Sequence, residues 1–381
     1  DVWNAFYLHS LILDHLESGS TLQLRHHAVS QARRLQPGLH IRNARTAGPG
    51  QEAWNHACNR CCYVYEGESG QQYQVSSVVT DGITIGRPTC SVHDCTNPLP
   101  NVRHHYCGPH HGLSKLCAVV KCDKEVEEGF RTCPFEDHRK IELYQYQKGK
   151  AMFQLKKRLE RVKGPGVDDD KELALTLEGT CDGKPETGNR NVQARFGRRW
   201  THNEQLCVAS CGVILGRATF YGSEAPNGVW TFWRRLFPTK ASLPFVLWHD
   251  NNCRVMAMLQ NDPNDHPDKG YFDVCALAVD VFHFNCKHKE SDEACNRDCN
   301  PYKWPILQTP KGNWCFNSSA AKQANTWFGG FQAIIQEMQV DRYEFFLDEM
   351  IKQRNRMIIK ELKCKGECPY LIPREELLRE D

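Results

Sequence analysis

The sequence predicts an α/β protein in which a mixed β-sheet is flanked by helices and preceded by a small cysteine/histidine module. Residues 245–248, FVLW, form an apolar run that is too short for a helix and is typical of a strand buried on both faces. From residue 173 to residue 284, strand-like and helix-like segments alternate in the way expected of a mixed sheet covered by helices. Cysteines and histidines at metal-ligand spacings in residues 90–138 predict the separate module.

Length and composition limit the classes of protein that the chain can represent. With 381 residues, the chain can form two or three domains that each have a core. The net charge of +2 is close to neutral, so affinity for nucleic acid requires local basic patches. Twenty cysteines at metal-ligand spacings favour reduced thiols in a cytosolic or nuclear protein. The sequence contains no apolar run of membrane-spanning length and no secretory signal, and because it starts at Asp1 we expect further residues before it.

The segments before the cysteines predict one helix and one connection. Apolar residues recur every three or four positions in residues 1–17, which predicts an amphipathic helix that ends at Gly19. Residues 22–51 contain the Pro37-Gly38 and Pro49-Gly50 breaks, which favour a connecting segment. The predicted domains are an N-terminal helical and connecting segment (1–51), a zinc-binding cysteine cluster (52–138), a basic helix and linker (139–172), the sheet domain (173–363) and a C-terminal tail (364–381).

An internal repeat predicts two structural zinc sites. Each copy provides three thiolates and one imidazole, which is a complete tetrahedral set for Zn²⁺. The ligands are Cys90, Cys95, Cys107 and His110 in the first copy, and Cys117, Cys122, Cys133 and His138 in the second. Because four protein ligands close the coordination sphere, we expect both ions to stabilise the fold and to do no chemistry.

Two further metal sites are predicted with less complete ligand sets. Cys58 and Cys61 form half of a site, and Cys62, His56 or the distant pair Cys364 and Cys368 are its candidate partners. A second set within the sheet domain, at residues 286–299, has spacings that suit one more zinc ion. Its ligands are Cys286, His288, Cys295 and Cys299.

Basic residues cluster in two segments that are candidates for phosphate contacts. Residues 138–163 predict a helix or helix pair rich in Lys and Arg, and residues 188–199 predict a basic turn or hairpin. A solvated surface explains either cluster equally well. The candidate DNA contacts are Lys156, Lys157, Arg158, Arg190, Arg195, Arg198 and Arg199.

The remaining segments predict the elements of the sheet domain. Residues 206–221 predict two adjoining strands or one bulged strand, and residues 275–284 predict a further strand. Residues 229–237 and the segment that starts at Cys253 predict helices. Residues 328–363 predict a long helical region whose apolar stripe faces the core.

Two aspartates follow apolar segments and are candidate metal ligands. Asp250 ends the 245–248 run, and Asp182 ends the similar segment 173–182. A carboxylate at the end of a buried strand is costly unless a partner such as a divalent cation neutralises it. Asn251, His249 and His283 are nearby polar residues, which are more typical of packing or turns than of ligation.

Several longer motifs together resemble the KDZ (Kyakuja, Dileera, Zisupton) transposases of fungi with their associated cysteine cluster. They are VVTDGITIGRPTC, the paired cysteine repeats, RFGRRWTHNEQLCV, GRATFYGSEAPNGV, WHDNNC, VDVFHFNCKHKESD and NSSAAKQANTWFGGF. The resemblance implies a cut-and-paste DNA transposase in the nucleus, possible homo-oligomers, and an RNase H-like core. In such a core an Asp, Asp, Glu triad binds two Mg²⁺ or Mn²⁺ ions, and Asp182 and Asp250 match the first two positions.

The third acidic position departs from the family pattern. Lys322 stands where the resemblance implies glutamate, and Glu337 could replace it only with a shifted helix register. A protonated lysine repels a cation and offers no lone pair, so we expect weak or absent cleavage. One alternative is a non-catalytic, zinc-stabilised DNA- or protein-binding factor derived from a transposase. Another is a zinc-based ubiquitin ligase or protein-interaction module, which predicts no affinity for DNA.

Overall fold

The computed structural model divides the chain into two compact units, which are described separately. The described residues are 2–27, 30–67, 70–92, 94–148, 194–260, 268, 270–287 and 292–379. The first unit comprises Asp1–Gly86, Asn203–Phe220 and Pro226–Asp381, and the second comprises Arg87–His202 and Tyr221–Ala225. Residues 52–86, which the sequence analysis assigned to the cysteine cluster, therefore belong to the first unit.

The first unit is built on a mixed sheet whose central strand is β3 (Gln72–Ile83). The strand order is β7-β6-β3-β8-β9, and β2 (Cys62–Glu66) pairs with the first half of β3. Strand β6 (Asn203–Ala209) pairs antiparallel with β3 on one side and with β7 (Ile214–Phe220) on the other. Strand β8 (Val246–Trp248) pairs parallel with β3 on one side and with β9 (Ala276–Ala278) on the other. The predicted mixed sheet is confirmed, and so is the strand predicted for 245–248. Of the two alternatives for 206–221, the structure has two adjoining strands, the first of which already begins at Asn203.

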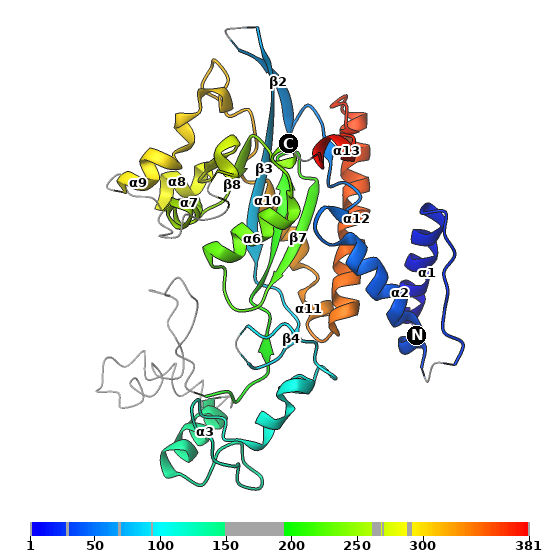
Figure 1. Cartoon of the computed structure of the whole chain (residues 1–381), viewed down its shortest axis with the longest axis vertical. Coiled ribbons are helices and arrows are strands. Elements are labelled where there is room, and N and C mark those ends of the chain that lie inside the picture. The colour runs from blue at the N-terminus through cyan, green and yellow to red at the C-terminus, as the bar shows by residue number, and fades with distance from the viewer. Residues whose placement is uncertain are drawn as a thin grey trace, which may run out of the picture. The chain divides into compact units, whose positions relative to one another are not determined.

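Helices cover both faces of this sheet (Figure 1). Alternate residues of each strand point to opposite faces, so Val78 packs with the helices α6 (Pro226–Leu236) and α7 (Asn252–Gln260). Its neighbour Val79 packs with α10 (Ala320–Gly329) and α12 (Val340–Cys364) on the other face. The indole of Trp233 on α6 also donates a 2.9 Å hydrogen bond to the Thr80 hydroxyl on β3. The result is a three-layer core of helices, sheet and helices.

Two N-terminal helices pack on α12 in the same unit (Figure 1). Helix α1 (Val2–Glu17) is the predicted amphipathic helix, and Tyr7 and Leu11 bury its apolar face against Phe345 of α12. The prediction of a connecting segment at 22–51 is wrong, because Gln31–Thr46 form helix α2 with Pro37 inside it. Packing of its buried leucines against α1 and α12 outweighs the local cost of proline.

The remaining elements of the first unit are short. The strand predicted for 275–284 is only partly correct: it ends at Ala278, and Val281–Lys287 form helix α8. Asp280 starts that helix, since its side chain accepts a hydrogen bond from the backbone N–H of His283 at 3.3 Å. The others are β1 (His56–Ala57) paired with β10 (Tyr370–Leu371), α9 (Glu293–Asp298), α11 (Gln332–Ile335) and α13 (Arg374–Leu377). None of the described helices combines the length and the apolar character that a membrane span requires.

The second unit contains little regular structure. Its short strands β4 (Pro88–Thr89) and β5 (Arg199–Trp200) form an antiparallel pair. A 3₁₀ helix covers Gly108–Lys115, and α3 (Glu136–Lys148) is the described part of the helix predicted for 138–163. Three of its cysteines are completely or almost completely buried although few apolar residues surround them: Cys90, Cys107 and Cys133. A small unit of this kind is typical of a fold that depends on bound metal.

Candidate functional sites: a carboxylate edge and three cysteine/histidine clusters

Three parallel strands of the first unit carry aspartates toward their carboxyl ends, within β3 and just after β8 and β9. The last residues of the parallel pairing are Val79 on β3, Trp248 on β8 and Ala278 on β9, while β3 itself continues to Ile83 beside β6. Asp81, Asp250 and Asp280 each follow two residues after these positions, so they share one row of the strand register. We call these three residues the carboxylate edge. The carboxyl ends of parallel strands are the usual place for ligand-binding groups in open α/β sheets.

Helix α10 contributes two side chains to the carboxylate edge. The Asn325 amide donates a 3.2 Å hydrogen bond to Asp81 Oδ2, and the backbone N–H of Gly82 donates a 3.0 Å bond to Asp81 Oδ1. One helical turn earlier, Lys322 Nζ lies 3.8 Å from Asp280 Oδ1. Asp81 is half-buried, whereas Asp280 and Asn325 are buried. The carboxylates are therefore held by donors from α10 and from the backbone.

Lys322 is enclosed by groups of the Asp280 turn. Its Nζ lies 3.2 Å from His283 Nδ1 and 4.7 Å from the centre of the Phe282 ring. His283 also contacts Asp280 through Nδ1, so lysine, histidine and aspartate form one polar group. The ammonium charge is thus placed at the carboxylate edge and partly neutralises Asp280.

The other predicted residues near this edge have structural contacts. His249 is buried, packs edge-on against Trp233 and places Nε2 3.5 Å from Asp250 Oδ1. Its Nδ1 accepts a 3.2 Å hydrogen bond from the backbone N–H of Asn251. The carboxylate oxygens are less closely gathered than the thiolates described below. Among the described residues, neither Asp81 nor Asp280 belongs to a group of three or more His, Cys, Asp or Glu ligand atoms that all lie within 4.8 Å of one another.

Asp81 was not among the site residues predicted from the sequence. The predicted residue Asp182 lies outside the described residues, and so do Lys156, Lys157, Arg158 and Arg190. The sequence does contain a signal for Asp81. The residues Val78, Val79 and Thr80 precede Asp81-Gly82, just as the strand-like segment 173–181 precedes Asp182-Gly183.

The second unit contains the two predicted zinc-ligand sets, each gathered around a common centre. In the first cluster (Cys90, Cys95, Cys107, His110) and in the second cluster (Cys117, Cys122, Cys133, His138), all ligand atoms lie within 4.8 Å of one another. The Cys95–Cys107 and Cys122–Cys133 sulfur pairs are each 3.8 Å apart. Tetrahedral Zn²⁺ with bonds of about 2.3 Å to sulfur requires a sulfur–sulfur edge of about 3.8 Å. Both clusters therefore fit a structural zinc ion.

The thiol pKa values in the second cluster differ because of their surroundings. Burial raises the pKa of Cys117. Burial also acts to raise the pKa of Cys133, but hydrogen bonds from the Phe135 backbone and from His138 lower it to about 7. At least one thiolate is therefore available near neutral pH, which is the form that binds zinc.

A third Cys/His cluster lies in the first unit. His56, Cys58 and Cys61 meet Cys211, and their ligand atoms also lie within 4.8 Å of one another. Of the candidate partners for Cys58 and Cys61, the structure brings His56 into the group, whereas Cys364 and Cys368 are exposed. Cys211 was missed, because it lies in the distant turn between β6 and β7 and no local spacing connects it to the others.

The predicted set at residues 286–299 is not gathered as a whole in the described residues. His288 lies outside them, and Cys286 is exposed on α8. Cys295 instead forms a group with Cys253 of α7 and Asp292. Buried Cys299 lies in the same hydrophobic cluster as these two cysteines. The sequence indicated Cys253 only as the start of a predicted helix, directly after the HDNN stretch.

The described arginines among the predicted DNA contacts also hold the second unit together. Arg198 donates a 3.2 Å hydrogen bond to the Val102 carbonyl and stacks on Trp200. Arg199 donates at 3.2 Å to the Val92 carbonyl, and burial lowers its pKa. The backbone N–H of Arg195 donates to Ala118 at 2.8 Å. Contacts of these residues with DNA stay a prediction.

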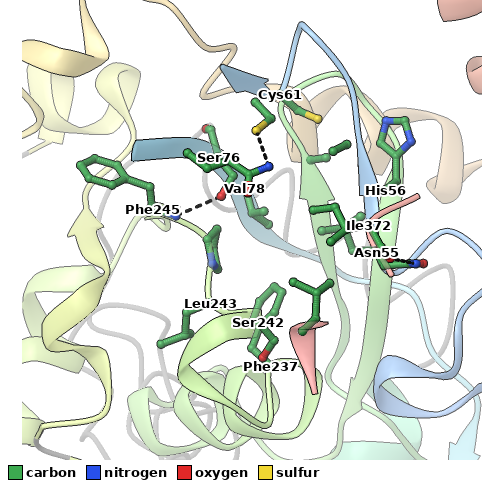
Figure 2. A pocket seen from close by; sticks show the side chains of 18 of the residues that line it. Asn55, His56, Cys61, Ser76, Val78, Phe237, Ser242, Leu243, Phe245 and Ile372 are labelled. Carbon is green, nitrogen blue, oxygen red and sulfur yellow. Dashed lines mark hydrogen bonds between the residues drawn. The ribbon is translucent and has the colours of Figure 1, made fainter. Parts of the chain in front are cut away.

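A pocket of about 260 Å³ lies in the first unit, between the β1–β2 region and residues 240–245. Figure 2 shows Ser76, Phe245 and Leu243 on one part of its wall and His56 and Cys61 on another. No member of the carboxylate edge lines it. Its volume is below the usual range for small-molecule sites, which begins at about 300 Å³.

The structure thus defines a mixed α/β protein with Cys/His clusters of the composition and spacing that structural zinc requires. Residues 79–144 match the family model described as "CxC6 like cysteine cluster associated with KDZ transposases". The chain therefore carries a KDZ-associated cysteine cluster, and the resemblance to these transposases is confirmed on this region, while its fungal type stays a prediction. No curated protein and no solved structure matches the chain. The matched region contains the first and second clusters and begins two residues before Asp81.

Proposed function

We propose that the chain is a transposase-like DNA-binding protein with an RNase H-like core whose capacity for DNA cleavage is impaired by Lys322. The observation that carries this proposal is the common register row of Asp81, Asp250 and Asp280, each two residues beyond the last parallel pair of β3, β8 or β9. The strand order supports the same fold, because an antiparallel three-strand part adjoins two parallel strands, as in RNase H-like sheets. The KDZ-associated cysteine cluster supports a transposase-like origin of the chain.

In this proposal Asp81, rather than Asp182, is the first acidic residue of the catalytic set, and Asp250 is the second. The two residues lie on neighbouring strands and at the same register position, which is the placement that a shared divalent cation requires. Mg²⁺ or Mn²⁺ bound there would activate water or a 3′-hydroxyl for attack on a phosphodiester. Asn325 would orient Asp81, because its amide already donates to one carboxylate oxygen.

Lys322 accounts for the impairment. Two-metal cleavage needs enough carboxylates to offset the charge of both ions. Here α10 presents an ammonium group 3.8 Å from Asp280, where the family pattern has a third acidic residue. An ion pair at this place competes with a cation for Asp280 and repels any cation bound by the neighbouring aspartates.

The test is metal-dependent nicking of plasmid DNA by four purified full-length proteins: wild type, Lys322→Glu, and Lys322→Glu combined with Asp81→Asn or with Asp250→Asn. We expect weak or no nicking by wild type, a gain of at least tenfold for Lys322→Glu, and loss of that gain in both double variants. Lys311→Glu is the matched control, because it makes the same charge change at an exposed position of the first unit. Equal nicking by Lys311→Glu and Lys322→Glu would contradict the proposal.

The polar group at Lys322 also favours a second candidate function, a non-catalytic DNA- or protein-binding factor derived from a transposase. In that case none of the variants nicks DNA, while wild type still binds it. An electrophoretic shift that weakens as salt rises measures the binding, because phosphate contacts release counterions. Absence of any shift at low salt would contradict DNA binding and leave protein binding. A DNA-binding role predicts a nuclear location, which a fluorescent fusion would test.

A further inference from the structure

The third cluster combines ligands from two segments that are far apart in the sequence. His56 is the first residue of β1, Cys58 directly follows that strand, and Cys61 immediately precedes β2. Cys211 comes from the turn that joins β6 to β7. His56, Cys58 and Cys61 are buried and Cys211 is partly exposed, so the group is almost completely removed from water. A thiolate at such a place is poorly solvated, so a cation bound by all four groups would stabilise the deprotonated form.

The spacing of these atoms matches a metal tetrahedron. The sulfurs of Cys58 and Cys61 are 3.6 Å apart, and Cys211 Sγ lies 3.4 Å from His56 Nε2. Zinc bonds of about 2.3 Å to sulfur and about 2.0 Å to nitrogen give tetrahedral edges of about 3.8 and 3.5 Å. A disulfide would bring two sulfurs to about 2.0 Å. The separations are also close to those of the first and second clusters, which are 3.8 Å between sulfurs and 3.3 to 3.5 Å from sulfur to nitrogen.

Both ligand-bearing turns are formed by the local backbone. The N–H groups of Cys61 and Cys62 donate to the Cys58 carbonyl at 3.0 and 2.9 Å, which folds the Cys-x2-Cys segment into a tight turn. In the other turn, Gly212 has a φ of +98° and donates to the Ala209 carbonyl at 2.7 Å. A side chain at Gly212 would be strained in this left-handed conformation, so the glycine allows Cys211 to reach the cluster.

We propose that His56, Cys58, Cys61 and Cys211 bind a structural Zn²⁺ that fastens the segment before β2 to the β6–β7 turn. The two attached parts both border the central strand, since Cys62 pairs with Ser76 and Ala209 pairs with Val78 of β3. The ion thus joins two segments that both hydrogen-bond to the backbone of Ser77 on β3, four residues before Asp81. Four protein ligands close its coordination sphere, so it stabilises the sheet and performs no reaction. This site is independent of the proposed function in DNA cleavage.

The pocket provides a route for exchange of the ion. His56 and Cys61 both lie on its wall, as Figure 2 shows. We expect the ion to exchange through this pocket, since a bound zinc site needs an entry path.

The first experiment measures zinc per chain by elemental analysis in the full-length wild type and in Cys211→Ser. We expect Cys211→Ser to contain one zinc equivalent fewer than wild type, whatever the other sites contribute. Cys62→Ser is the matched control, because Cys62 is buried beside Cys61 but accepts a hydrogen bond from Gln74 and is not in the cluster. Equal zinc content in wild type and Cys211→Ser, or the same loss in Cys62→Ser, would overturn the proposal.

The second experiment uses wild type alone and so does not depend on a variant that folds. The folded protein is treated with a thiol-alkylating reagent, with and without a zinc chelator, and the modified cysteines are identified by mass spectrometry. We expect the initial alkylation rates of Cys58, Cys61 and Cys211 to rise together by at least tenfold when the chelator is present. Cys207 and Cys275 are the controls, because they are buried in the same core cluster outside the site. Unchanged rates at the three ligands, or a disulfide between any two of them, would refute the site.

Discussion

Arg217 lies in a buried ion-pair network that joins the sheet to helix α12. Its guanidinium contacts Glu204 of β6 at 3.0 Å and Asp348 of α12 at 2.8 Å. The side chains of all three residues are at most 7% exposed. Arg217→Met therefore removes the cation that lies between two buried carboxylates, and such a change typically costs about 3 to 5 kcal/mol.

The remaining hydrogen bonds place the expected loss at the lower end of that range, about 3 kcal/mol. In Arg217→Met, Glu204 still accepts a hydrogen bond from the Tyr343 hydroxyl at 2.9 Å, and Asp348 still accepts one from the Gln51 amide at 2.8 Å. If the free energy of unfolding falls by about 3 kcal/mol per molar urea, the urea concentration at the unfolding midpoint should fall by roughly 1 M. Arg217→Lys keeps the charge but loses the two-pronged contact, so its midpoint should fall by less.

The assay is urea unfolding followed by tryptophan fluorescence, with Arg235→Gln on the exposed side of α6 as the control. Burial acts to lower the pKa of Arg217, but the carboxylates of Asp348 and Glu204 raise it above its ordinary value. A raised arginine pKa means that this stabilisation is fully present at any pH below the unfolded value, so the loss in Arg217→Met should be the same at pH of about 6 and about 9. A loss below 1 kcal/mol, or one equal to that of Arg235→Gln, would refute the reasoning.

Three further predictions concern the N-terminal helices and the second unit. A hydrogen bond from Arg356, assisted by Lys352, lowers the pKa of Glu17 to about 2. The stabilisation from this ion pair is therefore present above pH of about 4.5 and is lost as the pH falls toward 2. In urea unfolding, Glu17→Gln should be less stable than wild type above pH of about 4.5, and the difference in free energy of unfolding should disappear as the pH falls toward 2. Pro37→Ala adds an N–H inside α2 and should raise the free energy of unfolding by about 1 to 3 kcal/mol, whereas lower stability would show that the proline ring has an essential contact. Cys117→Ser should remove one zinc equivalent and make residues 87–148 more sensitive to limited proteolysis, and unchanged zinc content would contradict the second cluster.

Local patterns predicted the parts of the fold that depend on neighbouring residues. The four-residue apolar run identified β8, and the period of apolar residues identified α1. The repeated spacings identified both ligand sets of the second unit, because each set lies within a short segment whose ligands have few ways to meet.

The missed features depend on contacts between distant segments. The run before Asp81 resembles the run before Asp182, and only the pairing of β3 with β8 distinguishes an aspartate that lies beside Asp250. Likewise, no spacing rule connects Cys211 with Cys61, since the β6–β7 turn is brought to the β2 segment by the sheet. Helix α2 formed despite Pro37 because its leucines are buried on α1 and α12.

Mn²⁺ binding, followed by electron paramagnetic resonance, tests the role of the carboxylate edge most directly. We predict that Lys322→Glu binds Mn²⁺ at least tenfold more tightly than wild type, since an acidic side chain replaces the ammonium group beside Asp280. The further change Asp81→Asn should return the affinity to the wild-type value. If Lys322→Glu leaves Mn²⁺ binding unchanged, or if Asp81→Asn has no effect on it, the carboxylate edge is not a cation site.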